Sequence, residues 1–379
     1  GNKMSKHVGN VVNPFDMIHK YGADAVRFYM MTNSEPWDNL KFDANGVDEV
    51  RRKLFGTLYN TYSFFALYAN VDNFDVETPQ VDFAKRPEID RWILSCLQTL
   101  IKKVDAELKS YDPTRAGRLI DNFVNDDLSN TYVRQSRKRF WGKEMSDDKL
   151  SAYQTLHTCL LTVAKLLAPF APFYSDQLYH DLGGDMTSVH LENFPQANEA
   201  FINTDLEERM EIARKITSMT LALRRKVNIK VRQPLQQIMI PAVSAEQKAQ
   251  IEAVKDLIMS EVNVKELKFV EGEDILVKTV KCNFRTMGKK YGKLMKGVAN
   301  VMSNLDQHQI SQLEKEGSLF INVEGQDLVV DAADVEIISQ DIPGWLVSND
   351  GNVTVALEVE LTDELIKEGT ARELINRIQ

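Results

Sequence analysis

Residues 88–109, EIDRWILSCLQTLIKKVDAELK, carry the most regular hydrophobic pattern of the chain. Apolar side chains recur there at alternating intervals of three and four residues, at Ile89, Trp92, Ile93, Cys96, Leu97, Leu100, Ile101, Val104 and Leu108. This spacing places them on one face of an α-helix and does not fit the two-residue period of a strand. The stretch therefore predicts a long helix that packs against other helices along one side.

Similar patterns on both sides of this stretch predict further helices joined by short loops. Two short helices are expected over residues 14–21 and 23–31, and longer ones over 46–69, 112–139, 147–167 and 169–182. Long helices with short connections are typical of a helical bundle. We therefore expect an all-α domain over residues 45–200, preceded by a smaller segment over residues 1–44.

Beyond residue 200 the helical period gives way to short runs rich in β-branched residues. Strands are expected over residues 237–241, 264–270, 275–280, 319–323, 328–330, 335–339, 345–347 and 353–359. Helices are expected over residues 205–228, 244–261, 291–304 and 362–379. This mixture predicts an α+β region over residues 201–379 whose strands are mostly antiparallel. The whole chain is thus expected to be a multidomain protein.

The composition is that of an ordinary globular protein, with 43% apolar and 27% charged residues among 379. No run of about eighteen apolar residues occurs, so we expect no membrane-spanning helix. The three cysteines, Cys96, Cys159 and Cys282, lie far apart in the sequence. They match neither a disulfide framework nor a Cys-x-x-Cys metal site, so we expect a reducing, cytoplasmic setting and no metal site.

The net charge of −9 argues against indiscriminate binding to nucleic acid, yet the basic residues are clustered. Three stretches, 134–143, 224–232 and 278–296, contain several lysines and arginines and no acidic residue. An acidic protein with basic stripes can bind a polyanion along one face. The alternative is that each stretch is only a solvated helix face, and charge alone does not decide between the two.

The first ten residues, GNKMSKHVGN, form a basic loop flanked by Gly1 and Gly9. Lys3 and Lys6 lie three residues apart in it, and no acidic side chain occurs before Asp16. Glycine allows a loop to approach a ligand closely, and lysine supplies a compact positive charge suited to phosphates. The loop is therefore a candidate clamp for a polyphosphate, although most basic loops are merely solvated.

Several motifs spread along the chain resemble those of the class I aminoacyl-tRNA synthetases, and of their isoleucine enzymes in particular. The opening Lys3-Met4-Ser5-Lys6-His7 resembles the mobile signature loop of this family. Further matching stretches are residues 9–14, 21–27, 36–42, Ser136-Arg137-Lys138-Arg139-Phe140-Trp141, 231–235, 283–288 and 368–373. The chain has no initiator methionine and begins within a loop, so we expect it to be a C-terminal part of such an enzyme.

The resemblance implies a role for the opening loop in the activation of isoleucine with Mg-bound ATP. In this family the loop closes over ATP, and its second lysine, here Lys6, stabilises the departing pyrophosphate. A positioned cation lowers a barrier at which negative charge develops on phosphates. Lys3 is expected to be the second contact. Ser5 could donate a hydrogen bond to ATP, although a local turn-stabilising role fits it equally well. The family usually ends this loop on serine or arginine, and His7 departs from that pattern.

The resemblance further implies that the helical domain binds the anticodon of isoleucine tRNA. Unstacked bases bind to aromatic rings, and basic side chains hold the phosphates. The expected contacts in this domain are Arg134, Arg137, Lys138, Arg139, Phe140 and Trp141. Phe140 and Trp141 could instead be core residues that hold the helix terminus. In the C-terminal region Lys289, Lys290 and Lys293 are expected to touch only the tRNA backbone, because lysines alone do not read sequence.

Two alternatives remain open at this point. A valyl-type synthetase resembles the chain through the bundle but ends in a short coiled coil, whereas about 175 residues of mixed structure follow here, as expected of the isoleucine enzyme. The cysteine count excludes the bacterial form with a cysteine-bound C-terminal zinc, so we expect no zinc. A non-catalytic helical RNA-binding module is the other alternative. We expect a monomer that is inactive alone, because most of the catalytic domain and the editing domain would lie upstream.

Overall fold

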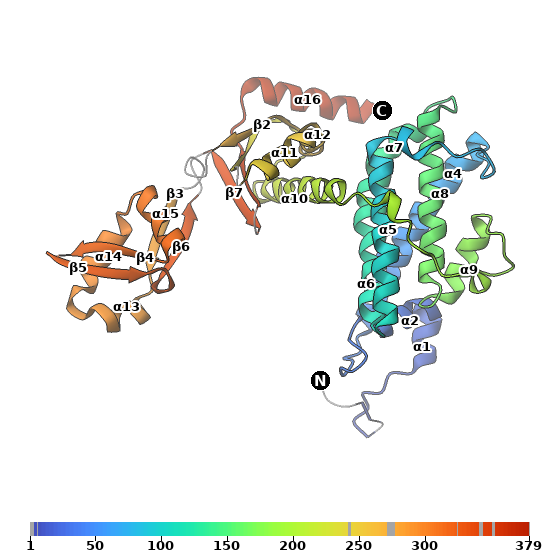
Figure 1. Cartoon of the computed structure of the whole chain (residues 1–379), viewed down its shortest axis with the longest axis horizontal. Helices are drawn as coiled ribbons and strands as arrows, with labels where there is room; N and C mark the ends of the chain where they lie inside the picture. Colours follow the sequence, from blue (N-terminus) through green and yellow to red (C-terminus); the bar gives the residue numbers. More distant parts are fainter. Residues whose placement is uncertain are drawn as a thin grey trace. The chain divides into compact units, whose positions relative to one another are not determined.

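The structure is a computed structural model that describes residues 4–5, 7–241, 244–270, 277–323, 325–340, 344–350 and 353–378. The chain divides into two compact units, residues 1–207 and 208–379. The first consists of helices and the second contains all the described strands (Figure 1). The expected fold class, a helical bundle followed by an α+β region with mostly antiparallel strands, is confirmed.

Three short helices open the helical unit at one end of the bundle (Figure 1). They are α1 (Pro14–Tyr21), α2 (Ala23–Thr32) and α3 (Ala44–Val50). Asn13 caps α1 through its side chain, and Pro14 occupies the first turn, where its missing N–H costs nothing. Ala25, Tyr29 and Val47 form a small core between these helices.

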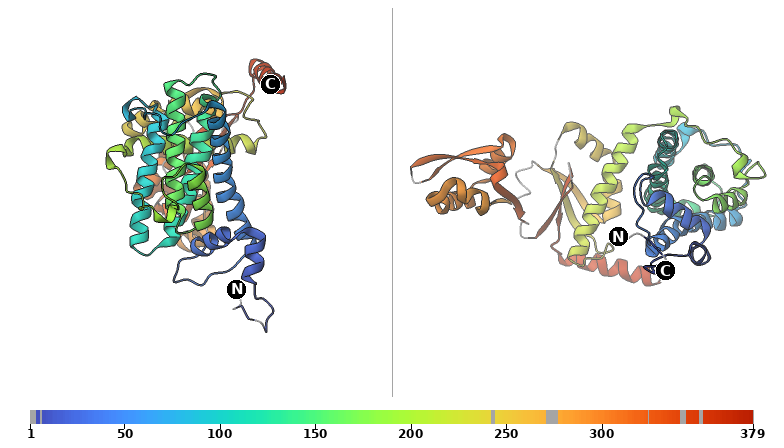
Figure 2. Two further views of the ribbon diagram at one scale, coloured as in Figure 1. Left: turned by 90° about the vertical axis from the view of Figure 1, so that its right-hand side faces the viewer. Right: turned by 90° about the horizontal axis from the view of Figure 1, so that it is seen from below.

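The bundle itself is built from further helices, the longest of which lie side by side in both Figures 1 and 2. They are α4 (Gly56–Asp72), α5 (Glu88–Lys109), α6 (Pro113–Asn122), α7 (Arg134–Phe140), α8 (Asp147–Leu167) and α9 (Pro172–Asp181). Two π-helical segments, Arg51–Phe55 and Phe123–Val133, make α3–α4 and α6–α7 nearly continuous. The predicted stretch forms α5, and its Trp92, Ile93 and Leu97 are buried in the core.

The helix α4 buries only part of its apolar and aromatic surface. Leu58 and Phe65 are buried on α4, whereas Tyr59 and Leu67 are 58% and 59% exposed. The helix is apolar on more sides than its partners α8 and the Phe123–Val133 segment can cover. Tyr59 and Leu67 therefore remain at the surface of the helical unit.

The second unit contains a four-stranded sheet in the order β2-β1-β8-β7. Its strands are β1 (Leu235–Pro241), β2 (Val264–Val270), β7 (Trp345–Asp350) and β8 (Val353–Glu358). The pair β1–β2 is parallel, and α11 (Ala245–Ala253) and α12 (Lys255–Val262) form the crossover between the two strands. Two further helices belong to this part, α10 (Thr204–Lys226) and α16 (Asp363–Ile378).

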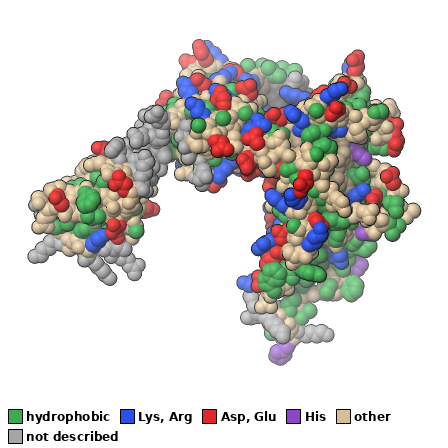
Figure 3. All heavy atoms as spheres, in the orientation of Figure 1, with side chains coloured by type: hydrophobic (Ala, Val, Ile, Leu, Met, Phe, Trp, Pro, Cys, Tyr) green, Lys and Arg blue, Asp and Glu red, His purple; other side chains and the backbone are tan. Residues whose placement is uncertain are grey.

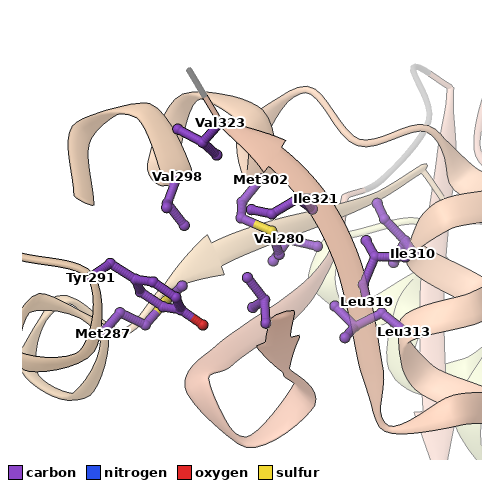
Figure 4. Packing of buried hydrophobic residues seen from close by; sticks show 11 residues of the cluster. Val280, Met287, Tyr291, Val298, Met302, Ile310, Leu313, Leu319, Ile321 and Val323 are labelled. Atoms are coloured by element: carbon purple, nitrogen blue, oxygen red, sulfur yellow. The ribbon is translucent and has the colours of Figure 1, made fainter. Parts of the chain in front are cut away.

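The remaining elements of this unit form two antiparallel strand pairs with helices. The pairs are β3 (Val277–Cys282) with β6 (Val335–Gln340), and β4 (Ser318–Val323) with β5 (Gln326–Asp331). The helices are α13 (Phe284–Tyr291), α14 (Met295–Ser303) and α15 (Gln307–Glu316). Figure 4 shows their shared core, in which Val298 and Met302 of α14 face Ile321 of β4.

Candidate nucleic-acid interface

The basic turn, which we define as residues 134–143, consists of α7 and the residues that follow it. Its cations differ in their surroundings. Arg134 is exposed and donates from Nε to the carbonyl oxygen of Asn130 at 2.8 Å. Arg137 and Lys138 are also exposed, and neither makes an ion pair with a described residue. Trp141 directly follows α7 and is 57% exposed. These side chains can contact a ligand without any change in the fold.

Arg139 points in the opposite direction, into the bundle. Its guanidinium binds both carboxylate oxygens of Asp90, with Nη1–Oδ1 and Nη2–Oδ2 distances of 2.6 and 2.8 Å. It also donates to the side chain of Asp148. Its side chain is 15% exposed and that of Asp90 is fully buried. Arg139 is therefore part of a structural ion pair whose guanidinium is already bound to Asp90, and its expected contact with tRNA stays a prediction.

Asp90 collects hydrogen bonds from three different elements. Besides Arg139, the hydroxyl of Tyr132 donates to it at 2.8 Å and that of Ser151 at 2.5 Å. Burial, together with the charge of Asp90, raises the pKa of Tyr132 well above its usual range. Burial alone lowers the pKa of Arg139, but its hydrogen bonds to Asp90 outweigh this and raise it. The network joins the start of α5 to the Phe123–Val133 segment, α7 and α8.

Phe140 belongs to the core rather than to the exposed face of the basic turn. It is 1% exposed, and its ring makes edge-to-face contacts with Phe64 and Tyr153 at centroid distances of 5.1 and 4.9 Å. A base could stack on it only if the bundle opened. Of the two alternatives that the sequence left for Phe140, the structure supports the core residue, and Trp141 is the aromatic side chain that remains accessible.

A second buried cation fixes the loop after Trp141. Lys149 lies on α8 with its side chain 3% exposed, pairs with Asp72 at the end of α4 and donates to the carbonyl oxygen of Gly142 at 2.6 Å. Tyr153 also donates to Asp72. Burial raises the pKa of Asp72, but the hydrogen bonds from Lys149 and Tyr153 outweigh it and lower that pKa. The loop that presents Trp141 is thus held on both sides by buried ion pairs.

The opening loop lies at the other end of the helical unit from the basic turn (Figure 1). The two ends are separated by α5, whose 22 residues span roughly 33 Å. Its first residues touch the basic turn through Asp90, and the helix α6 that follows it touches α2, where the Thr114 hydroxyl donates to the carbonyl oxygen of Met31 at 2.8 Å. The unit therefore places two candidate binding regions far apart.

The two lysines expected to bind ATP, Lys3 and Lys6, lie outside the described residues. Ser5 is described, and its contacts are local. Its hydroxyl oxygen accepts from the amide of Val8 at 3.2 Å, and its own amide donates to the side chain of Asn10 at 2.8 Å. Gly9 has a φ of 72°, which favours glycine. Ser5 thus fills the turn-stabilising role that was one of its two alternatives.

The lysine stretch of residues 278–296 offers fewer accessible cations than its sequence indicates. Lys290 pairs with Asp331 at 2.6 Å and Asp334 at 3.1 Å, and these hydrogen bonds raise its pKa. The expectation that it contacts the tRNA backbone is weakened because two acids already neutralise it. The side chains of Lys289 and Lys293 lie outside what the structure describes. Lys296 on α14 is exposed.

We define the basic loop as residues 224–232. Several of its cations also bind other groups of the protein. Arg224 is 1% exposed and donates to the carbonyl oxygens of Lys230, Gln233 and Asn263 at 3.2, 2.9 and 2.8 Å. Burial lowers its pKa. Lys230 and Arg232 both pair with Glu373 of α16, at 3.2 and 3.8 Å. On the face shown in Figure 3, blue cations are interspersed with red acids, so charge alone marks no binding surface.

Among the described residues no group of histidine, cysteine and carboxylate side chains could hold a metal ion. The three cysteines form no disulfide with one another, and burial raises the pKa of the Cys159 thiol above its usual range. The described helices include none that is both long and apolar enough to cross a membrane.

Comparison with known families defines the class of protein. Residues 90–240 match the family described as the anticodon-binding domain of tRNA ligase. Residues 1–43 match the family described as tRNA synthetases class I (I, L, M and V). The basic turn and its buried supports therefore lie in an anticodon-binding domain, and the opening loop lies in a class I synthetase domain.

Relatives that match the whole chain define the family more closely. Isoleucine–tRNA ligases from Bacteroides thetaiotaomicron, Porphyromonas gingivalis and Cytophaga hutchinsonii are 63%, 59% and 52% identical to it over 100% of its length. The chain belongs to the isoleucine–tRNA ligase family, as its motifs predicted, and corresponds to a C-terminal part of these relatives. It spans about a third of their length, 33%, 33% and 35% respectively.

Proposed function

We propose that the chain is part of an enzyme that activates isoleucine with ATP and transfers it to isoleucine tRNA, and that its helical unit binds the anticodon of that tRNA. The observation that carries the proposal is the basic turn, where Arg137, Lys138 and Trp141 are exposed on a support of buried ion pairs. The names of the relatives support isoleucine as the amino acid.

The exposed groups of the basic turn suit a single-stranded RNA loop. Arg137 and Lys138 supply the positive charge that phosphates need, and Trp141 supplies an indole ring on which an unstacked base can lie. Stacking on an accessible aromatic ring is worth about 1–3 kcal/mol per base. The ring must be held in place for this gain to be realised, and the Lys149–Gly142 hydrogen bond fixes the backbone next to Trp141.

The distance between the opening loop and the basic turn fits an enzyme that binds ATP at one place and the anticodon of its tRNA at another. We propose that Lys6, followed by Lys3, neutralises the phosphates of Mg-bound ATP while the basic turn holds the anticodon at the far end of α5. ATP supplies the adenylyl group of the activation step, and the two lysines stabilise the charge that develops on the departing pyrophosphate. We further propose a cytoplasmic monomer that carries no zinc in this part of the chain.

Filter binding with the 379-residue chain tests the anticodon assignment. We expect isoleucine tRNA to bind more tightly than the same tRNA with a changed anticodon, and binding to weaken steeply with salt because phosphate contacts release counterions. The double substitution Arg137→Ala and Trp141→Ala should weaken binding of isoleucine tRNA about tenfold or more and reduce the preference between the two tRNAs.

Lys103→Ala serves as the control, because Lys103 is an exposed lysine on α5 outside the basic turn. We expect it to leave both affinities almost unchanged. Equal binding of the two tRNAs by the unsubstituted chain, or equal effects of the control and the double substitution, would contradict the assignment.

A further inference from the structure

Gly142, near the end of the basic turn, is held to the bundle through its carbonyl oxygen. This oxygen accepts from Nζ of Lys149 at 2.6 Å, and the Lys149 side chain is 3% exposed and pairs with Asp72. The carbonyl therefore points inward, toward a buried cation. The peptide between Gly142 and Lys143 is trans, and in a planar trans peptide the C=O and the N–H point in opposite directions. The N–H of Lys143 therefore points outward.

The groups on the outward side of this peptide have no partner among the described residues. Within that part of the chain, neither the N–H of Lys143 nor that of Gly142 donates a hydrogen bond. The Lys143 side chain is exposed, and its ammonium group makes no ion pair with a described residue. A backbone donor and a cation of the same residue are thus available to a ligand.

Neither packing nor backbone conformation requires the glycine at position 142. Its φ is not positive, and a Cβ added there would meet no heavy atom of a non-adjacent residue within 4 Å. By contrast, a Cβ on Gly117 or Gly184 would meet side-chain atoms at 2.4 or 2.1 Å, so packing explains those two glycines. A glycine without such a need leaves the backbone open to close approach by a ligand.

An outward amide next to a free ammonium group suits a phosphate. Backbone N–H groups and lysines are both common phosphate contacts in nucleic-acid complexes. The last carbonyls of α7 carry partial negative charge that disfavours an anion, but Arg137 and Lys138 lie in this last turn and oppose it. Together with Lys143 they are three exposed cations without a described acidic partner. They outnumber the exposed acids that follow without a described cationic partner, Glu144 and Asp147.

We propose that the N–H and the ammonium group of Lys143 bind one phosphate of the tRNA, next to the base that stacks on Trp141, and that the open space at Gly142 lets this phosphate approach the backbone. Trp141 and Lys143 are two residues apart, so their Cα atoms lie within about 7 Å of each other. The inference rests on the proposed function, because the basic turn binds the tRNA that supplies the phosphate. It adds a contact that positions the tRNA backbone and reads no base.

Filter binding of isoleucine tRNA to the full 379-residue chain tests the role of the cation. Lys143→Ala should weaken binding about two- to tenfold. The slope of log affinity against log salt should become shallower by about 0.7, because one phosphate contact to a single strand is lost. Binding of the tRNA with a changed anticodon should weaken by the same factor, since a phosphate contact carries no sequence information. Lys103→Ala, the control on α5, should change none of these quantities.

Gly142→Ala tests the close approach to the backbone without any change in charge. The added methyl group would occupy the space assigned to the phosphate, so binding should weaken about twofold or more. Thermal unfolding should show no loss of stability, because alanine fits this backbone and meets open space. Gly56→Ala is the matched control, since Gly56 has helical φ and ψ and an added Cβ would make only an ordinary contact of 3.6 Å. It should leave binding unchanged.

Ethylation of the tRNA phosphates with ethylnitrosourea identifies the phosphate that is bound. One ethylated phosphate should interfere with binding to the unsubstituted chain and should no longer interfere with binding to the Lys143→Ala variant. Suppose that the unsubstituted chain binds isoleucine tRNA selectively. If Lys143→Ala then keeps the same affinity, salt dependence and interference pattern, or if Gly142→Ala weakens binding no more than Gly56→Ala, the phosphate site is contradicted and the proposed function stands. If the unsubstituted chain shows no selectivity for isoleucine tRNA, the proposed function fails, and the phosphate site with it.

Discussion

The basic turn and the basic loop look alike in sequence and differ in what their cations do. Each holds at least four lysines and arginines without an acid. In the basic turn one arginine, Arg139, is buried against Asp90, and Arg137 and Lys138 remain exposed. In the basic loop Arg224 is buried against carbonyl oxygens, and Lys230 and Arg232 share Glu373. The comparison shows that cations become available for a ligand only where no distant acid has already neutralised them.

The same comparison shows two ways of burying a guanidinium. Asp90 gives Arg139 a full counter-charge with two short hydrogen bonds. Arg224 has only the partial charges of three carbonyl oxygens, and its Nε makes no hydrogen bond with a described residue. An ionised partner makes a stronger hydrogen bond than a neutral one. We therefore expect disruption of the first arrangement to be more destabilising than disruption of the second.

The largest effect is expected for Asp90→Ala. This substitution leaves Arg139 without its bidentate partner in a buried site, and loss of one member of a buried pair costs about 3–5 kcal/mol. Urea unfolding, followed by the far-ultraviolet circular dichroism of the helices, measures the change in the free energy of unfolding. Asp105→Ala is the control, because Asp105 makes an exposed ion pair with Lys109 that is worth less than about 1 kcal/mol. Equal destabilisation by the two substitutions would show that the Asp90 network does not support the basic turn.

A smaller effect is expected for Arg224→Ala. The three carbonyl oxygens that accept from this side chain would lose a donor in a buried place, which costs about 1–3 kcal/mol. The adjacent Arg225 is exposed, so Arg225→Ala should change the free energy of unfolding by no more than about 0.5 kcal/mol. Both values come from the same urea titrations. An Arg225 variant as unstable as the Arg224 variant would mean that the carbonyl contacts contribute nothing specific.

The sequence predicted the helices whose own pattern is strong and missed those whose burial depends on other elements. The spacing in residues 88–109 was sufficient for α5. Helices α13 and α15 were not expected as separate helices, because each is short and buries few apolar side chains, such as Met287 or Ile310 and Leu313. The parallel pairing of β1 with β2 also could not be predicted, since strand direction in a sheet depends on the path of the crossover.

The stretch of sequence that contains the candidate site could be predicted, but which of its side chains are exposed and which are buried could not. Sequence identified residues 134–141, but the partners of Arg139 and Phe140 lie far away in the chain, at Asp90 and Tyr153. One feature of the sequence did indicate the buried ion pair. Asp90 lies three and seven residues before Ile93 and Leu97, so it belongs to the buried face of α5, where an acid requires a partner. The exposure of Arg137, by contrast, follows from packing that its own neighbours in sequence do not determine.

Footprinting of isoleucine tRNA on the 379-residue chain tests the central claim most directly, namely that the exposed half of the basic turn holds the anticodon. Hydroxyl-radical and base-specific probes should show the anticodon loop protected by the unsubstituted chain. With the double substitution Arg137→Ala and Trp141→Ala, that protection should disappear at a concentration where the unsubstituted chain still gives it. Protection of the anticodon loop that survives this double substitution, or its absence with the unsubstituted chain, would contradict the account.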